Sequence, residues 1–534
     1  MKLKIPSSVR NGRKPDGGIP VCPQSTEKGT SCLNVRCNSF LSNRIKELAK
    51  TRRSSFQVDE FLMHPFLLYL LGLISLYFFA KWLHKPRRKL PASPPKLPIL
   101  GNLHQLSALT HRSLQSLGRK YGPLMLLHFS SRPVIIVQSA DAATEIMKTN
   151  DLIFADKPAT RTTRRLFYDM KDISVAPYGE YWRKLKSVCV LQLLSSKRVQ
   201  SFNFIREEET ELLVKRIKSH HCPSLSPVNL SELFTSLTND VICRAAFGRK
   251  YSDGEDGKKF LMLLTKGLQL VGSISIGDFI PCLSWINRVN GFDNRVDKVA
   301  EEVDAFLEMV IQEHLNEELQ SCGAADPDQD ERRENFVDIL LNIYKDNNTG
   351  VSIDKDSIKA IILDILAGGT DTTSATLEWA MTELLRHPMA LKNLQNELRG
   401  ILKDKQDITE NVLSKMNYLK AVVKETLRLH PPITFRSCVL DEPEKFKPER
   451  FLTCSIDFKG LDFQFIPFGA GRRGCPGTAF AMASVELVLA NLVQKFEWEL
   501  PKGMKSEDLD FEEQPGVTIH RKNPLFAVAT HCYF

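Results

Sequence analysis

The chain has 534 residues, 43% apolar and 25% charged, which is an ordinary composition for a globular protein with a large core. Its net charge is +9, but residues 1–62 contain 12 Lys and Arg against 5 Asp and Glu, so the rest of the chain is close to neutral. Because the main body lacks a broad basic surface, we set nucleic-acid binding aside as a function.

The 12 cysteines are scattered along the chain without a CxxC pair or a regular spacing. This pattern indicates reduced thiols in a cytosol-like compartment. Since free cysteine packs as a small hydrophobic residue, eleven of them need no special role, and only Cys475 has unusual neighbours.

Residues 61–82 are almost wholly apolar, and a helix of this length would span roughly 33 Å, enough for one membrane crossing. We predict a single transmembrane anchor here; a buried core helix is the alternative. Residues 1–60 are expected to be a disordered basic extension, a transit peptide or a misread gene start. Five basic residues flank the run on each side, so the positive-inside rule orients it clearly only if translation begins at Met63.

Residues 83–98 are basic and proline-rich, which predicts a stiff hinge before a catalytic domain over residues 99–534. A short strand is expected at 133–138, and apolar residues at three-to-four spacing then predict helices. The predicted helices are 142–150, 181–194, 205–219, 230–247, 296–319 and 354–386. The fold class is therefore mainly α with a small β component.

The stretch 468–477, FGAGRRGCPG, follows a strand-like segment at 463–467 and precedes a helical pattern at 478–494. Gly469, Gly471 and Gly474 satisfy GxGxxG, the pattern of a dinucleotide-binding turn. Against this function, only a short length of chain remains for the βαβαβ unit, and the bulky pair Arg472 and Arg473 stands where the backbone must approach pyrophosphate.

Cys475 supports a different interpretation of the same stretch. A cysteine at a helix entrance meets unpaired N–H groups that favour a thiolate, and the glycines let the backbone approach a flat ligand. A thiolate is the axial ligand that helps haem iron to cleave O₂. Arg473 is placed to meet a haem propionate.

Gly368 and Gly369 interrupt the apolar helix 354–386 and are expected to weaken it locally. Asp371 and Thr372 follow them. A hydroxyl beside bound oxygen, with a carboxylate linked to solvent, would form a proton relay.

The motif F-x-x-G-x-R-x-C-x-G is met by the five residues Phe468, Gly471, Arg473, Cys475 and Gly477. It resembles the haem-binding loop of cytochromes P-450, and Asp371 with Thr372 resembles the oxygen-activating helix of that family. The resemblance runs from about residue 61 to 534 and is greatest to the plant A-type microsomal group, near the seventy-one family.

The resemblance assigns further residues by motif. Glu425 and Arg428 match E-x-x-R and Arg450 matches P-E-R-F, which implies a structural network behind the haem. Trp182 and Lys186 match a W-x-x-x-R/K pattern that grips a propionate.

The resemblance also implies a cytochrome P-450 fold, haem b and a monooxygenase that uses O₂ and electrons from a separate NADPH-cytochrome reductase. The implied substrate is a small hydrophobic plant metabolite of terpenoid, coumarin or indole type. The implied location is the endoplasmic reticulum membrane with a cytosolic catalytic domain, or a plastid if residues 1–62 are a genuine transit peptide. Basic residues at 183, 184, 197 and 198 form a candidate reductase-docking patch, and pocket walls are expected at 161–175, 267–279, 362–370 and 516–518.

The sequence departs from the family after Pro432. There the family continues through several strands, whereas Ile433–Leu440 leads almost directly to Asp441, so part of the small β-sheet region is expected to be missing. Such a loss would leave a sheet edge unpaired. Two alternatives follow: a truncated, non-catalytic splice or pseudogene product that does not hold haem, and a haem-thiolate isomerase or dehydratase, which the intact Asp371–Thr372 pair argues against.

Overall fold

A computed structural model describes residues 68–77, 80, 90–219, 226–251, 254–273, 275–321, 334–346, 353–401, 408–433 and 442–532. The chain divides into two units, Met1–Lys89 and Leu90–Phe534. In the first unit Leu68–Tyr77 is an apolar helix, and its side chains are exposed. The remainder of the predicted anchor, apart from residue 80, and the predicted basic extension 1–60 lie outside the described residues.

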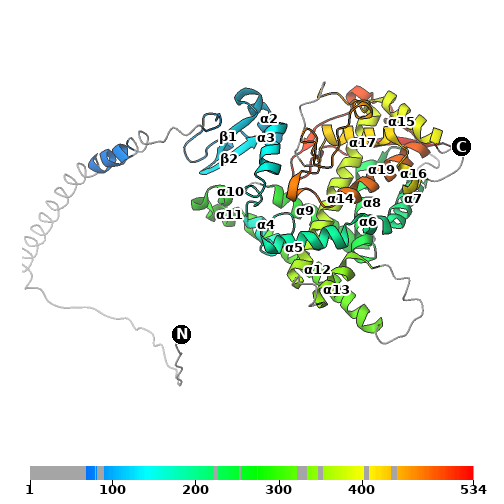
Figure 1. Ribbon diagram of the computed structural model, residues 1–534, viewed down its shortest axis with the longest axis horizontal. Helices are drawn as coiled ribbons and strands as arrows, with labels where there is room; N and C mark the ends of the chain where they lie inside the picture. Colours follow the sequence, from blue (N-terminus) through cyan, green and yellow to red (C-terminus); the bar gives the residue numbers. More distant parts are fainter. Residues whose placement is uncertain are drawn as a thin grey trace, which may run out of the picture. The chain divides into compact units, whose positions relative to one another are not determined.

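The second unit is mainly helical (Figure 1). Its α-helices are α2 Thr110–Tyr121, α3 Ala140–Thr144, α4 Arg161–Leu166, α5 Glu180–Val188, α6 Ser196–Ser201, α7 Asn203–Ser219, α8 Leu230–Phe247, α9 Gly254–Gly272, α10 Ile276–Phe279, α11 Trp285–Val289, α12 Phe292–Ser321, α13 Phe336–Lys345, α14 Lys355–Arg386, α15 Pro388–Ile401, α16 Glu410–Leu413, α17 Asn417–Leu429, α18 Arg450–Thr453 and α19 Thr478–Lys495. The helix predicted at 230–247 matches α8, and the one predicted at 354–386 matches α14 with its N-cap.

The strands are short and antiparallel. They are β1 Leu124–Phe129, β2 Arg132–Val137, β3 Val228–Asn229, β4 Phe496–Glu499, β5 Glu513–Gln514, β6 His520–Arg521 and β7 Phe526–His531. The sheets have the orders β1-β2, β3-β7-β4 and β5-β6. Within the described part of the chain, β2 pairs with β1 alone, and its Ile135 is 48% exposed.

Helix α14 is the central element, since it packs against α8, α19 and α17 (Figure 1). Its sequence explains this position, because Trp379 and nearly every residue from Thr373 to Leu385 are buried. Asp354 caps its N-terminus by accepting a hydrogen bond from the Ser357 N–H at 2.8 Å. A 32-residue helix that is apolar on most sides is stable only when other helices surround it.

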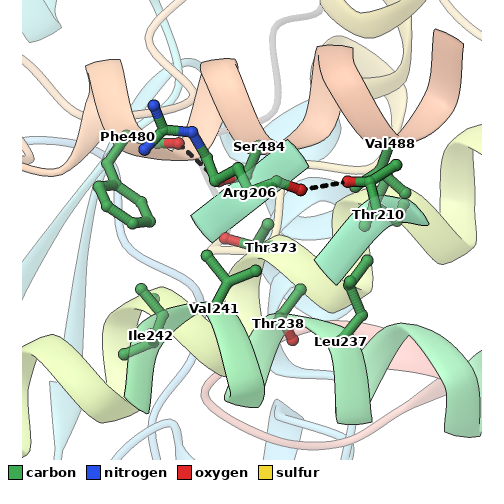
Figure 2. Close-up of a pocket in the computed structure, with 12 residues that line it drawn as sticks. Arg206, Thr210, Leu237, Thr238, Val241, Ile242, Thr373, Phe480, Ser484 and Val488 are labelled. Atoms are coloured by element: carbon green, nitrogen blue, oxygen red, sulfur yellow. Dashed lines mark hydrogen bonds between the residues drawn. The ribbon is translucent and has the colours of Figure 1, made fainter. Parts of the chain in front are cut away.

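A small cavity of about 10 Å³ lies where α7, α8, α14 and α19 meet, and it has room for about one water molecule. Figure 2 shows Thr373 of α14 facing it together with Phe480 and Ser484 of α19. The start of α19, directly after the Cys475 loop, therefore lies beside the middle of α14.

Three sequence-based expectations differ from the structure. Residues 463–467 form turns rather than a strand, which also removes the strand that a dinucleotide-binding turn would need. Helix α14 continues without a break through Gly368 and Gly369; Gly369 packs closely on Ile242 of α8, whereas Gly368 is exposed. The second unit begins at Leu90, within the stretch 83–98 that was predicted as a hinge, and Ala92 bridges to Met125 of β1.

One helical stretch of the described chain, Lys259–Phe279, is long and apolar enough to cross a membrane by length and composition. It covers α9 from Lys259 onward together with α10, and Phe260 stacks on Phe306 of α12 with 3.9 Å between ring centroids. Because α9 packs within the second unit, this stretch is distinct from the predicted anchor at 61–82.

Candidate active site

The Cys475 loop is a glycine-dependent turn. Gly469 and Gly471 have φ angles of +69° and +65°, which L side chains rarely adopt. A Cβ on Gly471 would stand 2.2 Å from the Met147 carbonyl oxygen, so no other residue fits there. The Cys475 N–H donates to the Phe468 carbonyl at 2.9 Å, which closes the turn and fixes the direction of the thiol.

The Phe468 ring anchors the loop by an edge contact with Phe458, with 5.7 Å between centroids. Gly477 stands on the thiol side of the loop, since a Cβ there would lie 3.8 Å from the Cys475 sulfur. The 3₁₀ turn Gly471–Arg473 and the loop up to Thr478 thus present the sulfur at the entrance of α19.

The Cys475 residue is exposed, yet its thiol lies deep enough for burial to raise its pKa. Hydrogen bonds from the Gly477 backbone and the Thr478 side chain, and the charge of Lys186, act in the opposite direction. In the protein without a bound metal ion, burial outweighs these effects and the pKa of the Cys475 thiol stays above its usual value. A bound metal ion would supply the missing positive charge and deprotonate the thiol.

Trp182, Lys186 and Arg473, predicted separately, lie together. The Arg473 Cζ lies 4.1 Å from the centroid of the Trp182 ring, and the Lys186 Nζ lies 5.3 Å from the same centroid. Trp182 and Arg473 both donate to the Ile173 carbonyl, at 2.9 and 3.2 Å. The structure therefore unites α5 with the Cys475 loop in one positively charged cluster.

Sequence reasoning missed a third cation, Lys157. Burial lowers the pKa of Lys157, Lys186 and Arg473, and the positive charge of Arg473 lowers that of both lysines further. The polar contacts of Arg473 are carbonyl oxygens, those of Ala155, Ile173 and Ala176 at 2.8, 3.2 and 2.6 Å. Partly buried cations that repel one another fit an anionic ligand such as a pair of carboxylates.

Asp371 and Thr372 lie on the accessible face of α14. Gly368 is exposed on the same face, and a Cβ there would meet nothing within 4 Å, which indicates open space. The Thr372 hydroxyl donates to the Gly368 carbonyl at 2.5 Å, and the Asp371 carboxylate pairs with His520 at 2.9 Å. A polar pair beside open space in a buried helix is unusual, and it can move protons.

Glu425, Arg428 and Arg450 form the predicted network. Arg428 donates to both oxygens of Glu425, at 2.8 and 2.9 Å, and Arg450 donates to Glu425 at 3.0 Å. The side chains of Glu425 and Arg428 are 0% exposed. This spacing is usually found on helix surfaces, so only the tertiary structure reveals that the pair is buried.

Two further groups escaped sequence reasoning. Asp364 of α14 accepts hydrogen bonds from the Ile173 and Ser174 N–H groups at 2.7 and 3.2 Å, and burial and the nearby Asp172 raise its pKa well above its usual value. His520 of β6 lies far from Asp371 in the sequence. Its only sequence signal is its place two residues after the expected pocket wall 516–518.

The family model for cytochrome P450 matches residues 91–439 and 436–528. The chain belongs to this family. Cytochrome P450 71A8 of Mentha piperita is 51% identical over 512 residues, which cover 89% of this chain and 97% of the relative. The (+)-menthofuran synthase of the same plant is 44% identical over 495 residues, covering 86% of this chain and 97% of the relative.

A solved zebrafish cytochrome P450 with abiraterone has the same fold, with a TM-score of 0.64 and 22% identity over 80% of this chain and 100% of that chain. Membership identifies the chain as a cytochrome P450 monooxygenase, and the family implies a haem-iron cofactor, a redox partner, O₂ and a hydrophobic substrate. The positively charged cluster beside Cys475 fits such a cofactor, because haem carries two propionates.

Proposed function

We propose that the protein oxidises a small hydrophobic plant metabolite of terpenoid, coumarin or indole type, using haem b, O₂ and electrons from a separate NADPH-cytochrome reductase. The proposal rests chiefly on one arrangement: the Cys475 loop closes beside three positively charged side chains that lack carboxylate partners of their own among the described contacts.

Each predicted cofactor residue has a role that its contacts support. Cys475 would bind the iron through its sulfur, while Phe468, Gly471 and Gly477 keep its loop in shape. Arg473 and Lys186 would bind the propionates by charge, and the Trp182 ring, which both cations contact, would hold them in place. Glu425, Arg428 and Arg450 would hold residues 442–450 behind this loop. When bound, the haem supplies the redox chemistry that activates O₂.

Asp371 and Thr372 would deliver protons to the oxygen side of the site. Thr372 presents a hydroxyl at the open face of α14, and Asp371 is 24% exposed, so water can reach its carboxylate. A carboxylate that exchanges protons with water beside a hydroxyl is the usual form of such a relay.

The four predicted pocket walls contact one another, which supports the proposal that they surround one substrate pocket. The end of α9 meets the 516–518 segment, since a Cβ on Gly272 would lie 2.9 Å from the Val517 nitrogen. Arg161 of α4 donates its N–H to Asp278 of α10 at 3.1 Å, and Asp364 of α14 holds the Ile173 segment. One relative is named for the synthesis of (+)-menthofuran, which supports the terpenoid part of the proposal.

We place the chain in the endoplasmic reticulum membrane through an anchor at 61–82, followed by a hinge at 83–98 and a cytosolic catalytic domain from residue 99. The apolar, exposed helix Leu68–Tyr77 and the membrane-associated type of the related plant enzymes support this location. Arg183, Lys184, Lys197 and Arg198 remain the proposed reductase surface; Lys184 pairs with Glu180 at 2.9 Å, and Arg198 with Glu334 at 3.5 Å.

We also infer that a few dozen residues are missing after Pro432. The two family matches meet at 436–439, and an alignment of 512 residues covers only 89% of a 534-residue chain, so some positions of the relative have no counterpart here. Among the described residues β2 pairs with β1 alone, which agrees with the loss of strands that would otherwise extend this sheet. The comparisons do not favour the non-catalytic alternative.

The test is the carbon-monoxide difference spectrum of the reduced full chain in microsomal membranes, beside Cys475→Ala and a matched Cys454→Ala control. A strongly red-shifted Soret band in the wild type and the control, absent from Cys475→Ala, is the expected result. Equal expression of all three proteins without any haem band would refute the proposal.

A further inference from the structure

His520 lies between two carboxylates of α14. Its Nε2 is 2.9 Å from the Asp371 Oδ1, and its Nδ1 is 3.8 Å from the Glu378 Oε2. Asp371 and Glu378 are seven residues apart and therefore share one face of the helix. One imidazole thus spans two turns of α14.

The backbone next to His520 is fixed on both sides. The Ile519 N–H donates to the Pro432 carbonyl at 2.9 Å, and the Trp379 indole donates to the Ile519 carbonyl at 2.9 Å. His520 also pairs with Gln514 of β5 in the register of the sheet. The strand pairing and the hydrogen bonds of Ile519 to Pro432 and Trp379 therefore fix the backbone from which the His520 side chain points at α14.

The surroundings of His520 favour the imidazolium. Burial alone would lower its pKa, but hydrogen bonding and charge attraction from Asp371 and Glu378 raise it to about 9. The other nearby charge, Arg521, donates to the Asp510 carbonyl at 2.7 Å and to Thr382 at 3.3 Å. On the far side, the Ser231 hydroxyl donates to Glu378.

We infer that His520 is a positioning residue for proton delivery: it orients the Asp371 carboxylate and returns protons to it. The inference rests on the proposed role of Asp371. After the Asp371 carboxyl has given up its proton, the proton on His520 Nε2 moves to Asp371 Oδ1, and a proton from the solvent then recharges the imidazole; no electrons are transferred. The His520 side chain is 25% exposed, which gives water access to the ring.

A relay that includes His520 would respond to pH in a way that a structural contact would not. Above about pH 9 the imidazole loses its proton, so it can no longer supply Asp371. In this range the share of consumed O₂ recovered as hydrogen peroxide should rise, because slow proton delivery favours release of partly reduced oxygen.

The experiment uses the full chain with its haem, a separate plant reductase and NADPH, without an added substrate. Hydrogen peroxide formed per O₂ consumed is measured from pH 6.5 to 10 for the wild type, His520→Gln and His387→Gln. His387→Gln is the matched control, because His387 also pairs with a carboxylate of α14, Glu383 at 3.2 Å, and has a raised pKa. Haem content from the carbon-monoxide spectrum normalises each rate.

We expect the hydrogen peroxide share at pH 7 to rise at least threefold in His520→Gln and to become independent of pH, while His387→Gln behaves as the wild type. Unfolding of the same proteins gives a second measurement. The stabilisation by His520 should be complete below about pH 6.5, be lost as the pH rises through about 9, and shrink when Asp371→Asn is also present.

Equal peroxide shares in the wild type and His520→Gln, with a normal haem spectrum in both, would overturn the inference and leave the monooxygenase proposal standing. Absence of the haem band from the wild type would instead refute the proposed function itself. If the hydrogen peroxide share rose equally in His387→Gln, the rise would follow from the loss of any ion pair on α14, and this too would overturn the inference.

Discussion

Removal of the Glu425 charge should destabilise the protein severely. The Glu425 carboxylate accepts hydrogen bonds from Nε and Nη2 of Arg428, from Nε of Arg450 and from the Lys447 backbone N–H, at 2.8–3.0 Å. Arg428 is 0% exposed, so Glu425→Gln leaves a buried guanidinium without its counter-charge. Such losses cost about 3–5 kcal/mol, and the one oxygen that Gln retains favours the lower end, about 3 kcal/mol.

The assay is urea unfolding followed by tryptophan fluorescence, with Glu211→Gln as the control. Glu211 makes the same kind of pair with Lys215 at 2.7 Å, but both side chains are more than half exposed, so its loss should cost less than about 1 kcal/mol. A drop of about 3 kcal/mol is more than a hundredfold in the folded-to-unfolded ratio. If both substitutions lowered the unfolding free energy by less than about 1 kcal/mol, the reasoning about buried charge would be refuted.

Three further outcomes are expected. Lys186→Met should weaken haem retention about tenfold in a haem-transfer assay, because it removes one propionate partner, whereas Lys184→Met should not. Asp364→Asn keeps an acceptor for the Ile173 N–H but removes a carboxylate whose pKa is raised in the folded protein. Because a raised pKa destabilises the fold only above the pKa of the unfolded chain, the variant should have a larger unfolding free energy than the wild type at pH 8, and this gain should vanish near pH 4. No gain at pH 8 would contradict this reasoning. Ile135→Lys on the exposed strand β2 should lower the aggregated fraction in size-exclusion chromatography of detergent-solubilised protein, and an unchanged fraction would count against an open sheet edge.

The sequence located the parts of the site that depend on local chemistry. The glycines around Cys475 are required by positive φ angles and by close contact with Met147, so the motif itself encodes the turn. Helices such as α8 and α14 were predicted closely, because long apolar periodicity overrides weak residues such as Gly368.

The sequence could not supply facts that depend on the surroundings of a residue. The pKa of the Cys475 thiol is raised because burial outweighs its hydrogen bonds and the charge of Lys186, and these surroundings exist only in the folded protein. Residues 463–467 have a strand-like composition but no partner strand, so they form turns.

By itself, then, the sequence determined the family, the glycine-dependent turn around Cys475 and the order of the helices, because these follow from residues that are neighbours in the chain. Tertiary structure alone decided that Lys157 joins Lys186 and Arg473, that Glu425 is fully buried, and that His520 reaches Asp371. The physical reason is that charge and burial depend on distances in space, and β6 contacts α14 although the two are far apart in the sequence.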